Sequence, residues 1–123
     1  MKIVLVILVF LFCSTTKLTI AQSSPLASFA GKTAGHVYSG SAIKVQELKV
    51  ENCTGCIISN FALTIIKDGD YLTLNSTSAK LTDRMRLLIG ELKKEQVMYF
   101  DLIHFIDTNG IEKIVPEFEL KIW

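Results

Sequence analysis

Hydrophobic stretches of strand length dominate the second half of the chain. Residues 57–66 and 97–106 are rich in β-branched and aromatic side chains, and the second stretch predicts a strand buried on both faces. Apolar and polar residues alternate over 118–122, which predicts a last strand with one buried face. A weaker alternation over 43–50 predicts another strand, with a bulge near Gln46.

The period changes over residues 81–93. Apolar residues recur there at the spacing of an amphipathic helix, at Leu81, Met85, Leu88 and Leu92. Thr82 is a suitable N-cap, and Asp83 suits the positive end of the helix dipole. Lys93 and Lys94 suit the other end of the dipole. The pattern therefore predicts one amphipathic α-helix at about 81–93.

Turn residues separate the predicted strands. Lys-Asp-Gly-Asp at 67–70 predicts the turn of a hairpin, and Thr-Asn-Gly at 108–110 predicts a turn. Strands and helices do not alternate regularly, which argues against a parallel doubly wound sheet. The expected fold class is mainly β: an antiparallel β-sandwich-like domain with one inserted helix, preceded by a signal peptide.

The beginning of the chain has the pattern of a secretory leader. Lys2 precedes an apolar run over 3–12, which is too short to span a bilayer. Small residues at positions 19 and 21 predict cleavage between Ala21 and Gln22. We expect three segments: a signal peptide (1–21), an extended lead-in (22–41) with a short strand near 36–38, and a β-rich domain (42–123). An uncleaved anchor remains an alternative.

Charge narrows the class of partner. Cleavage after residue 21 removes Lys2 and Lys17 but no acid, which leaves 11 basic and 12 acidic residues and a net charge of −1. Nucleic-acid binding needs a basic surface, so we expect no nucleic-acid partner. We also expect no membrane contact after cleavage. The oligomeric state stays open at this point.

Cys53 and Cys56 are the sharpest local feature. Both follow the predicted leader, and an exported protein meets an oxidising compartment, so a disulfide between them is expected. A redox role is the alternative, but redox pairs of this spacing lie at a helix N-terminus, and here a strand follows. A zinc site needs about four ligands. Besides the two cysteines only His36 and His104 remain, and there is no second pair of cysteines after the leader, so a zinc site is not expected.

Catalytic motifs are not recognisable in this chain. There is no nucleophile elbow, no zinc-protease helix motif and no phosphate-binding glycine loop. His104 lies within a predicted strand and is expected to be a satisfied strand residue. We therefore expect no enzyme activity, no cofactor and no bound metal.

Several stretches, in order, carry a resemblance to a known family. They are Pro25 to Gly35, Ile57 to Ile65, Leu81 to Met85 with Ile89 and Leu92-Lys93, Val97 to Asp101, Asp107 to Gly110, and Pro116 with the final strand. In these stretches the chain resembles the C-terminal periplasmic domain of GldM, a gliding-motility protein of the type IX secretion system of Bacteroidetes. The resemblance implies a β-sandwich-like fold, a protein–protein role and no catalytic residues. We expect this chain to act without the membrane helix and the shaft domains of that family.

Three functions follow from these observations. The first is an exported, non-enzymatic interaction module that binds an envelope protein in the periplasm or outside the cell, associated with gliding motility or type IX secretion. The second is an exported thiol-disulfide protein that uses Cys53 and Cys56. The third is a secreted surface- or carbohydrate-binding β-sandwich, whose amphipathic aromatics are Tyr38, Tyr71, Tyr99 and Trp123.

Overall fold

The computed structural model describes residues 24–123. The predicted signal peptide and its cleavage site between Ala21 and Gln22 lie outside the described residues. The described elements are, in chain order, β1 (Leu26–Ser28), β2 (His36–Val37), α2 (Ser39–Ala42), β3 (Lys49–Glu51), β4 (Ile57–Lys67), β5 (Asp70–Ser76), α3 (Asp83–Gly90), β6 (Val97–Ile106), β7 (Glu112–Ile114) and β8 (Phe118–Ile122).

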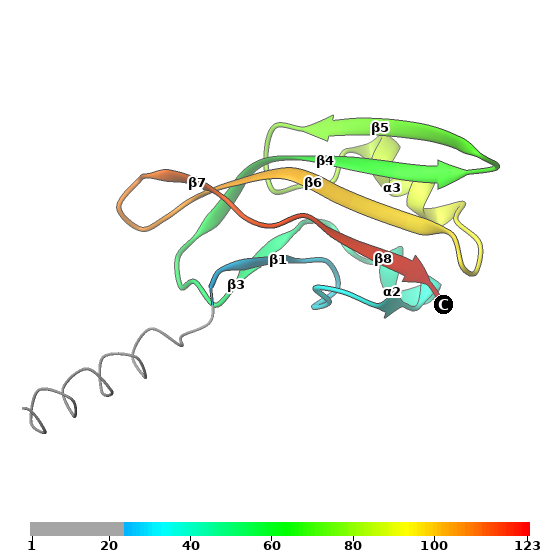
Figure 1. Cartoon of the computed structure of the whole chain (residues 1–123), viewed down its shortest axis with the longest axis horizontal. Helices are drawn as coiled ribbons and strands as arrows, with labels where there is room; N and C mark the ends of the chain where they lie inside the picture. Colours follow the sequence, from blue (N-terminus) through cyan, green and yellow to red (C-terminus); the bar gives the residue numbers. More distant parts are fainter. Residues whose placement is uncertain (1–23) are drawn as a thin grey trace, which may run out of the picture.

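The two long apolar stretches form the centre of a six-stranded sheet (Figure 1). β4 and β6 pair antiparallel along most of their length. The strand order is β2-β8-β6-β4-β5, and β7 also pairs with β6. The prediction of a mainly β fold is confirmed. All pairings in this sheet are antiparallel except one, because β2 runs parallel to β8.

Both predicted turns are confirmed, and each of them joins two antiparallel strands. Asp68 and Gly69 connect β4 to β5 with φ values of 53° and 82°, and two residues with positive φ suit the right-handed twist of a hairpin. The Asn-Gly turn connects β6 to β7. β7 and β8 lie along the same edge of β6, and Val115 between them donates its backbone N–H to the Ile103 carbonyl at 3.1 Å.

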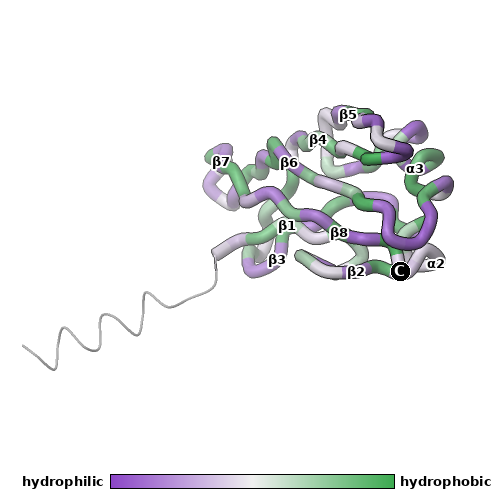
Figure 2. The backbone as a smooth tube through the Cα atoms, turned by 45° about the vertical axis from the view of Figure 1, so that its right-hand side comes forward, coloured by the Kyte–Doolittle hydropathy of each residue, from purple (hydrophilic) through white to green (hydrophobic). Residues whose placement is uncertain are grey.

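The hydrophobic core lies on one face of the sheet. α2, α3 and a two-stranded ribbon of β1 and β3 contribute to it together with the inward residues of the large sheet. Three phenylalanines mark its centre: the ring of Phe100 stacks on Phe118 at 4.8 Å and contacts Phe29 at 5.3 Å between centroids. Each fully buried aromatic of this size contributes about 2–3 kcal/mol. Hydrophobic and hydrophilic positions are interleaved along the strands (Figure 2).

The segment predicted as a lead-in takes part in the fold from residue 24 onward. It supplies β1, β2 and most of α2, and Phe29 is fully buried against the sheet. The strand expected near 36–38 is present at His36–Val37. These residues therefore belong to the same hydrophobic core as the strands that follow them.

The predicted helix is present but shorter than 81–93. α3 covers only Asp83–Gly90, and Thr82 caps it by accepting the N–H of Met85 at 3.2 Å, as expected. Glycine is a poor helix residue, and the helix ends at Gly90. Lys93 and Lys94 therefore lie beyond the helix and do not support its C-terminus.

Two strand predictions are wrong in extent. Over 43–50, a strand begins only at Lys49. Ile43 and Lys44 form the turn that ends α2, where the N–H of Ile43 donates to the Ser39 carbonyl at 3.1 Å, and Glu47 forms only an isolated bridge with Lys80. β6 is not buried on both faces: Tyr99 and Asp101 on its outer face are only half-buried. α3 and the ribbon of β1 and β3 cover the inner face of the sheet. Among the described elements, none covers the outer face of β6 in this way.

Candidate interaction surface

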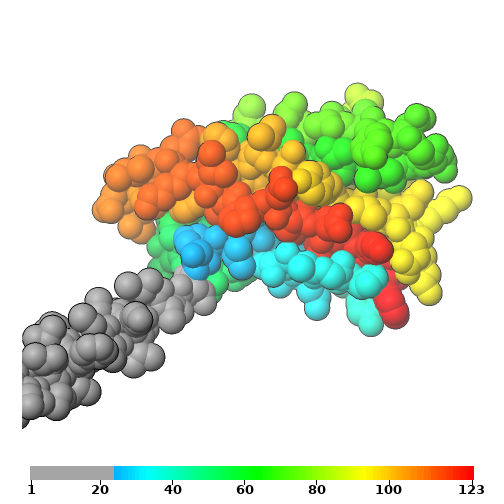
Figure 3. All heavy atoms as spheres, viewed as in Figure 1, coloured from blue at the N-terminus to red at the C-terminus, as the bar shows by residue number. Residues whose placement is uncertain are grey.

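The outer face of the sheet carries exposed aliphatic residues where β4, β6 and β7 meet. The register places Ile57 opposite Ile106 and His104 opposite Ile114, so these side chains share one face. Ile57, Leu102 and Ile114 are 65%, 66% and 71% exposed. We call this the hairpin-end surface, made of Ile57, Leu102, Ile106 and Ile114 around His104 and Glu112. The β6–β7 hairpin, orange in Figure 3, protrudes at one end of the molecule.

A bulge in β6 turns Leu102 outward. The β4–β6 register shifts on both sides of Asn60, opposite Asp101 to His104. Leu102 has a φ of 49°, which is in the left-handed region that leucine rarely adopts. The extra residue shifts the alternation by one position, so that Ile103 and Phe105 point into the core after Met98 and Phe100. The strained position therefore serves both the core and the surface.

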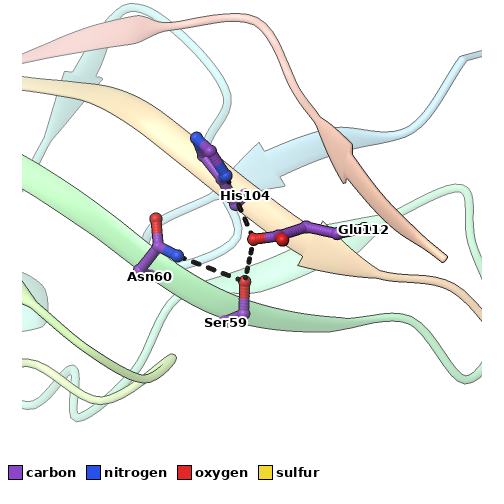
Figure 4. A network of polar contacts seen from close by, with 4 residues as sticks. All are labelled: Ser59, Asn60, His104 and Glu112. Atoms are coloured by element: carbon purple, nitrogen blue, oxygen red, sulfur yellow. Dashed lines mark hydrogen bonds and ion pairs between the residues drawn. The ribbon is translucent and has the colours of Figure 1, made fainter. Parts of the chain in front are cut away.

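Polar side chains form a network in the middle of this surface (Figure 4). His104 Nδ1 lies 3.1 Å from Glu112 Oε1, and Ser59 Oγ donates to the same oxygen at 3.4 Å. An ionised carboxylate only accepts, so the His104 Nδ1–H is the donor to Glu112. Asn60 Nδ2 donates weakly to Ser59 Oγ at 3.5 Å. The network ties β4, β6 and β7 together.

The geometry of the network does not favour nucleophilic catalysis. A serine nucleophile needs a base within hydrogen-bond reach of its hydroxyl, with a third group to orient that base. Here the carboxylate of Glu112 stands between Ser59 and His104, and the imidazole makes no bond to the hydroxyl. As expected, His104 is a strand residue with a polar partner.

The turn of the β6–β7 hairpin is held by Asp107. Its Oδ1 accepts the N–H groups of Asn109 and Ile111 at 2.9 and 3.0 Å, and its Oδ2 pairs with Lys113 Nζ at 3.1 Å. The Ile111 N–H is the main cause that lowers the pKa of Asp107, and Lys113 adds to it. The exposed Ile111 and Ile114 therefore stand on a well-defined hairpin.

A groove borders the hairpin-end surface. It has a volume of about 440 Å³ and is lined by Leu102, His104, Ile114, Val115, Pro116 and Glu117. Pro116 has no N–H, and it separates β7 from β8 at this point. The lining joins residues from the strand, the hairpin and the following loop into one concave strip.

Acidic residues lie next to the groove on the outer face. A hydrogen bond with Glu117 raises the pKa of Tyr99 to about 12. Burial raises the pKa of Asp101, and its Oδ1 is buried without a hydrogen-bond partner. The outer face therefore changes from aliphatic at the hairpin to polar and acidic along β8.

Cys53 and Cys56 lie at disulfide distance in the loop between β3 and β4, with Cα atoms 5.6 Å apart. The loop packs against the hairpin turn. Gly55 has a φ of 79°, and a Cβ at this position would lie 2.9 Å from Thr108 Cγ2. The cysteines therefore flank the hairpin-end surface, and they are followed by a strand, not a helix.

The four aromatics suggested for ligand binding do not form one site. Tyr71 and Tyr99 lie on the outer face of β5 and β6. Tyr38 and Trp123 instead line a common pocket at the far end of the sheet. The sequence analysis did not identify Leu102, Glu112 or Ile114 as surface residues of this site. The Asn-Gly turn is the signal that could have found Ile114, because the hairpin that it forms places Ile114 opposite His104.

Among residues 24–123, no group of three or more His, Cys, Asp or Glu side chains is placed to hold a metal ion. In the same part of the chain, no helix has both the length and the apolar character that crossing a bilayer requires. No protein-family model matches the chain, and no curated protein does either.

Proposed function

We propose that this protein is an exported, non-enzymatic interaction module of the cell envelope, and that it binds a partner protein through the hairpin-end surface. The observation that carries this proposal is the cluster of exposed isoleucine and leucine side chains on a well-ordered hairpin. Exposed aliphatic residues in contiguous clusters are typical of protein–protein contact sites.

The arrangement of this surface suits a protein partner. Aliphatic residues surround a paired His104 and Glu112, and at an interface such apolar residues supply buried area while a few polar groups set orientation. The adjacent groove of about 440 Å³ offers room for a side chain of the partner. The exposed aliphatic residues of the hairpin-end surface do not contribute to the core of the domain. They would contribute buried apolar area to the interface when a partner protein covers them.

The resemblance to the C-terminal domain of GldM supports the same class of function. On that view, the domain is β-sandwich-like, it reaches the periplasm through a cleaved signal peptide, and its partner belongs to the gliding-motility or type IX secretion machinery. The placement of Cys53 and Cys56 supports an oxidising compartment and a disulfide between them.

Site-specific photo-crosslinking in the native host tests this proposal. A crosslinking residue at Ile114 or Leu102 should capture one and the same envelope protein. A crosslinker at Leu87, which is equally exposed on α3, is the matched control and should not capture it. In addition, Ile114→Asp should abolish the product formed from position 102.

Two results would contradict the proposal. One is the same product from position 87 as from 102 and 114, because this would indicate non-specific proximity. The other is undiminished capture of the envelope protein by a crosslinking residue at position 102 in the Ile114→Asp variant. Far-UV circular dichroism of the Ile114→Asp protein checks that the sheet is intact, and an exposed site is expected to tolerate the change.

A further inference from the structure

A second site lies at the end of the sheet away from the hairpin. Lys32, His36, Tyr38 and Trp123 line a pocket of about 350 Å³. β8 pairs there with the Val97 end of β6, whereas β7 pairs with the Ile106 end. The pocket and the hairpin-end surface are therefore separate sites, near the Val97 end and the Ile106 end of β6. Figure 1 shows the C-terminus and β7 toward opposite ends of the molecule.

Strand pairing brings these aromatic side chains together. β2 lies parallel to β8, with Val37 opposite Ile122, and the N–H of Trp123 donates to the Val37 carbonyl at 2.9 Å. Val37 and Ile122 are both buried. Because successive residues of an extended strand point to opposite sides, the neighbours of the two buried residues point outward.

The rings are ordered but not covered. The ring of Trp123 contacts His36 edge-on, with centroids 5.1 Å apart and planes at 77°. The ammonium of Lys94 lies 5.3 Å from the Trp123 ring centroid, within the range of a cation–π contact. Even so, Tyr38 is 66% exposed and Trp123 is 52% exposed. These contacts fix the orientation of the indole and leave ring surface free for a ligand.

Charge selects the kind of ligand. Lys32 belongs to the lining and Lys94 approaches Trp123, and among residues 24–123 no carboxylate side chain belongs to the lining. A ligand for this site therefore combines a ring with an apolar face and an anionic group. The volume is at the small end for ligand pockets, which suits one or two sugar rings and not a folded protein.

We propose that the pocket binds a carboxylate-bearing sugar, namely a uronic acid. The apolar face of the pyranose ring lies against Trp123 and Tyr38, and the carboxylate pairs with Lys32. Free sugar acid and the uronic acid units of a polysaccharide share this chemistry. The site does not overlap the hairpin-end surface, so its test is independent of the proposed protein partner.

Trp123 gives a direct reading of this site, because it is the only tryptophan in the chain. Its fluorescence is followed while the protein is titrated with galacturonic acid tetramer, with monomeric galacturonate, and with a neutral glucose tetramer of equal length. We expect a saturable change with the acidic sugars and an affinity at least about tenfold lower for the neutral tetramer. A higher affinity for the galacturonic acid tetramer than for monomeric galacturonate indicates a polysaccharide as the source of the ligand. Equal affinity for the two indicates the free sugar acid.

Variants assign the binding to the pocket. Lys32→Ala and Tyr38→Ala should each weaken binding of the acidic sugar about tenfold, since an ion pair or a stacked ring is lost. Tyr71→Ala removes an exposed tyrosine on β5 and is the matched control, with no expected change. If Tyr38→Ala loses its far-UV sheet signal, the exposed Lys32 carries the test alone.

Three outcomes would overturn the proposal. The first is no saturable change of Trp123 fluorescence with either acidic sugar up to millimolar concentration. The second is equal binding of the neutral and acidic tetramers, because charge would then play no role. The third is an equal loss of binding in the Tyr71→Ala control, which would place the sugar elsewhere.

Discussion

The two ends of the sheet share a scaffold but carry different chemistry. At one end, aliphatic side chains surround His104 and Glu112 on a hairpin held by hydrogen bonds. At the other, His36, Tyr38 and Trp123 form an aromatic pocket with basic residues at its side. β6 runs through both, and its inward residues are buried at each end.

This difference shows how one small domain separates stability from recognition. The inward positions are set by strand alternation and by the common core. The outward positions are free to vary, because they contribute little to that core. Aliphatic residues suit a broad protein contact, whereas rings with a cation suit a small anionic ligand. Each end can therefore be altered without loss of the other, as long as the core between them remains.

The largest expected effect comes from the core that the ends share. Phe100 is fully buried and contacts Phe29 and Phe118, so Phe100→Ala should reduce the free energy of unfolding by about 3–5 kcal/mol. Urea unfolding is measured by Trp123 fluorescence, which reports one end, and by far-UV circular dichroism, which reports the whole sheet. The two transitions should coincide. Separate transitions would show that the ends fold independently.

Reduction of the cysteine pair should act mainly at the hairpin end. The closed loop is very short, so the loss of stability should be about 2 kcal/mol. Because Gly55 packs against Thr108, amide exchange should rise in the β6–β7 turn more than in β2. Cys53→Ser with Cys56→Ser should reproduce the effect. An equal rise of amide exchange in the β6–β7 turn and in β2 would contradict an effect confined to the hairpin end. A reductase activity of the wild-type protein that Cys56→Ser abolishes would favour the thiol-disulfide function.

Replacement of Leu102 should separate stability from binding at the hairpin end. Leu102→Gly relieves a positive φ and is expected to stabilise the fold by about 0.5 kcal/mol, while it weakens partner capture. Leu87→Gly is the matched control: the residue is equally exposed, but it lies inside α3, so the fold should lose about 1 kcal/mol. Thermal melts compare the two variants. The same sign for both would rule out relief of strain.

The smallest expected effect is a pH response confined to the hairpin. The pKa of Asp107 is lowered from 3.8 in the folded state. Its stabilising contribution is thus fully present above pH 3.8 and is lost as the pH falls through the lower, folded pKa. The amide shifts of Asn109 and Ile111 should report this titration by NMR, and Asp107→Asn should remove it. A titration of these amides that persists in the variant would assign it to another group.

Much of the fold follows from local sequence signals. The alternation of β8, the Asp-Gly and Asn-Gly turns and the Thr82 cap each act over a few residues, and all are confirmed. The mainly β class follows from them. The parallel pairing of β2 with β8 joins distant segments, and no local pattern predicts it. The four residues of α2 are likewise fixed by backbone hydrogen bonds and not by any hydrophobic period.

The candidate sites were harder to predict for the same reason. The continuous apolar stretch over 97–106 predicts a buried Leu102, but the side chain is exposed. Such a stretch does not show where a bulge reverses the alternation. The sequence suggests Tyr38 and Trp123 together with Tyr71 and Tyr99 as amphipathic aromatics, but only the pairing of two distant strands shows that Tyr38 and Trp123 are neighbours. His104 was identified, yet its partner Glu112 depends on the register of the hairpin.

The pairing of β2 with β8 also bears on the order in which the chain can fold. β2 has β8 as its partner in the sheet, and β8 is the last strand of the described residues. Contacts between such distant segments form late and slowly. β2 therefore stays without its strand partner until β8 is in place. On the export route proposed above, this late pairing would favour translocation of a chain that is not yet closed.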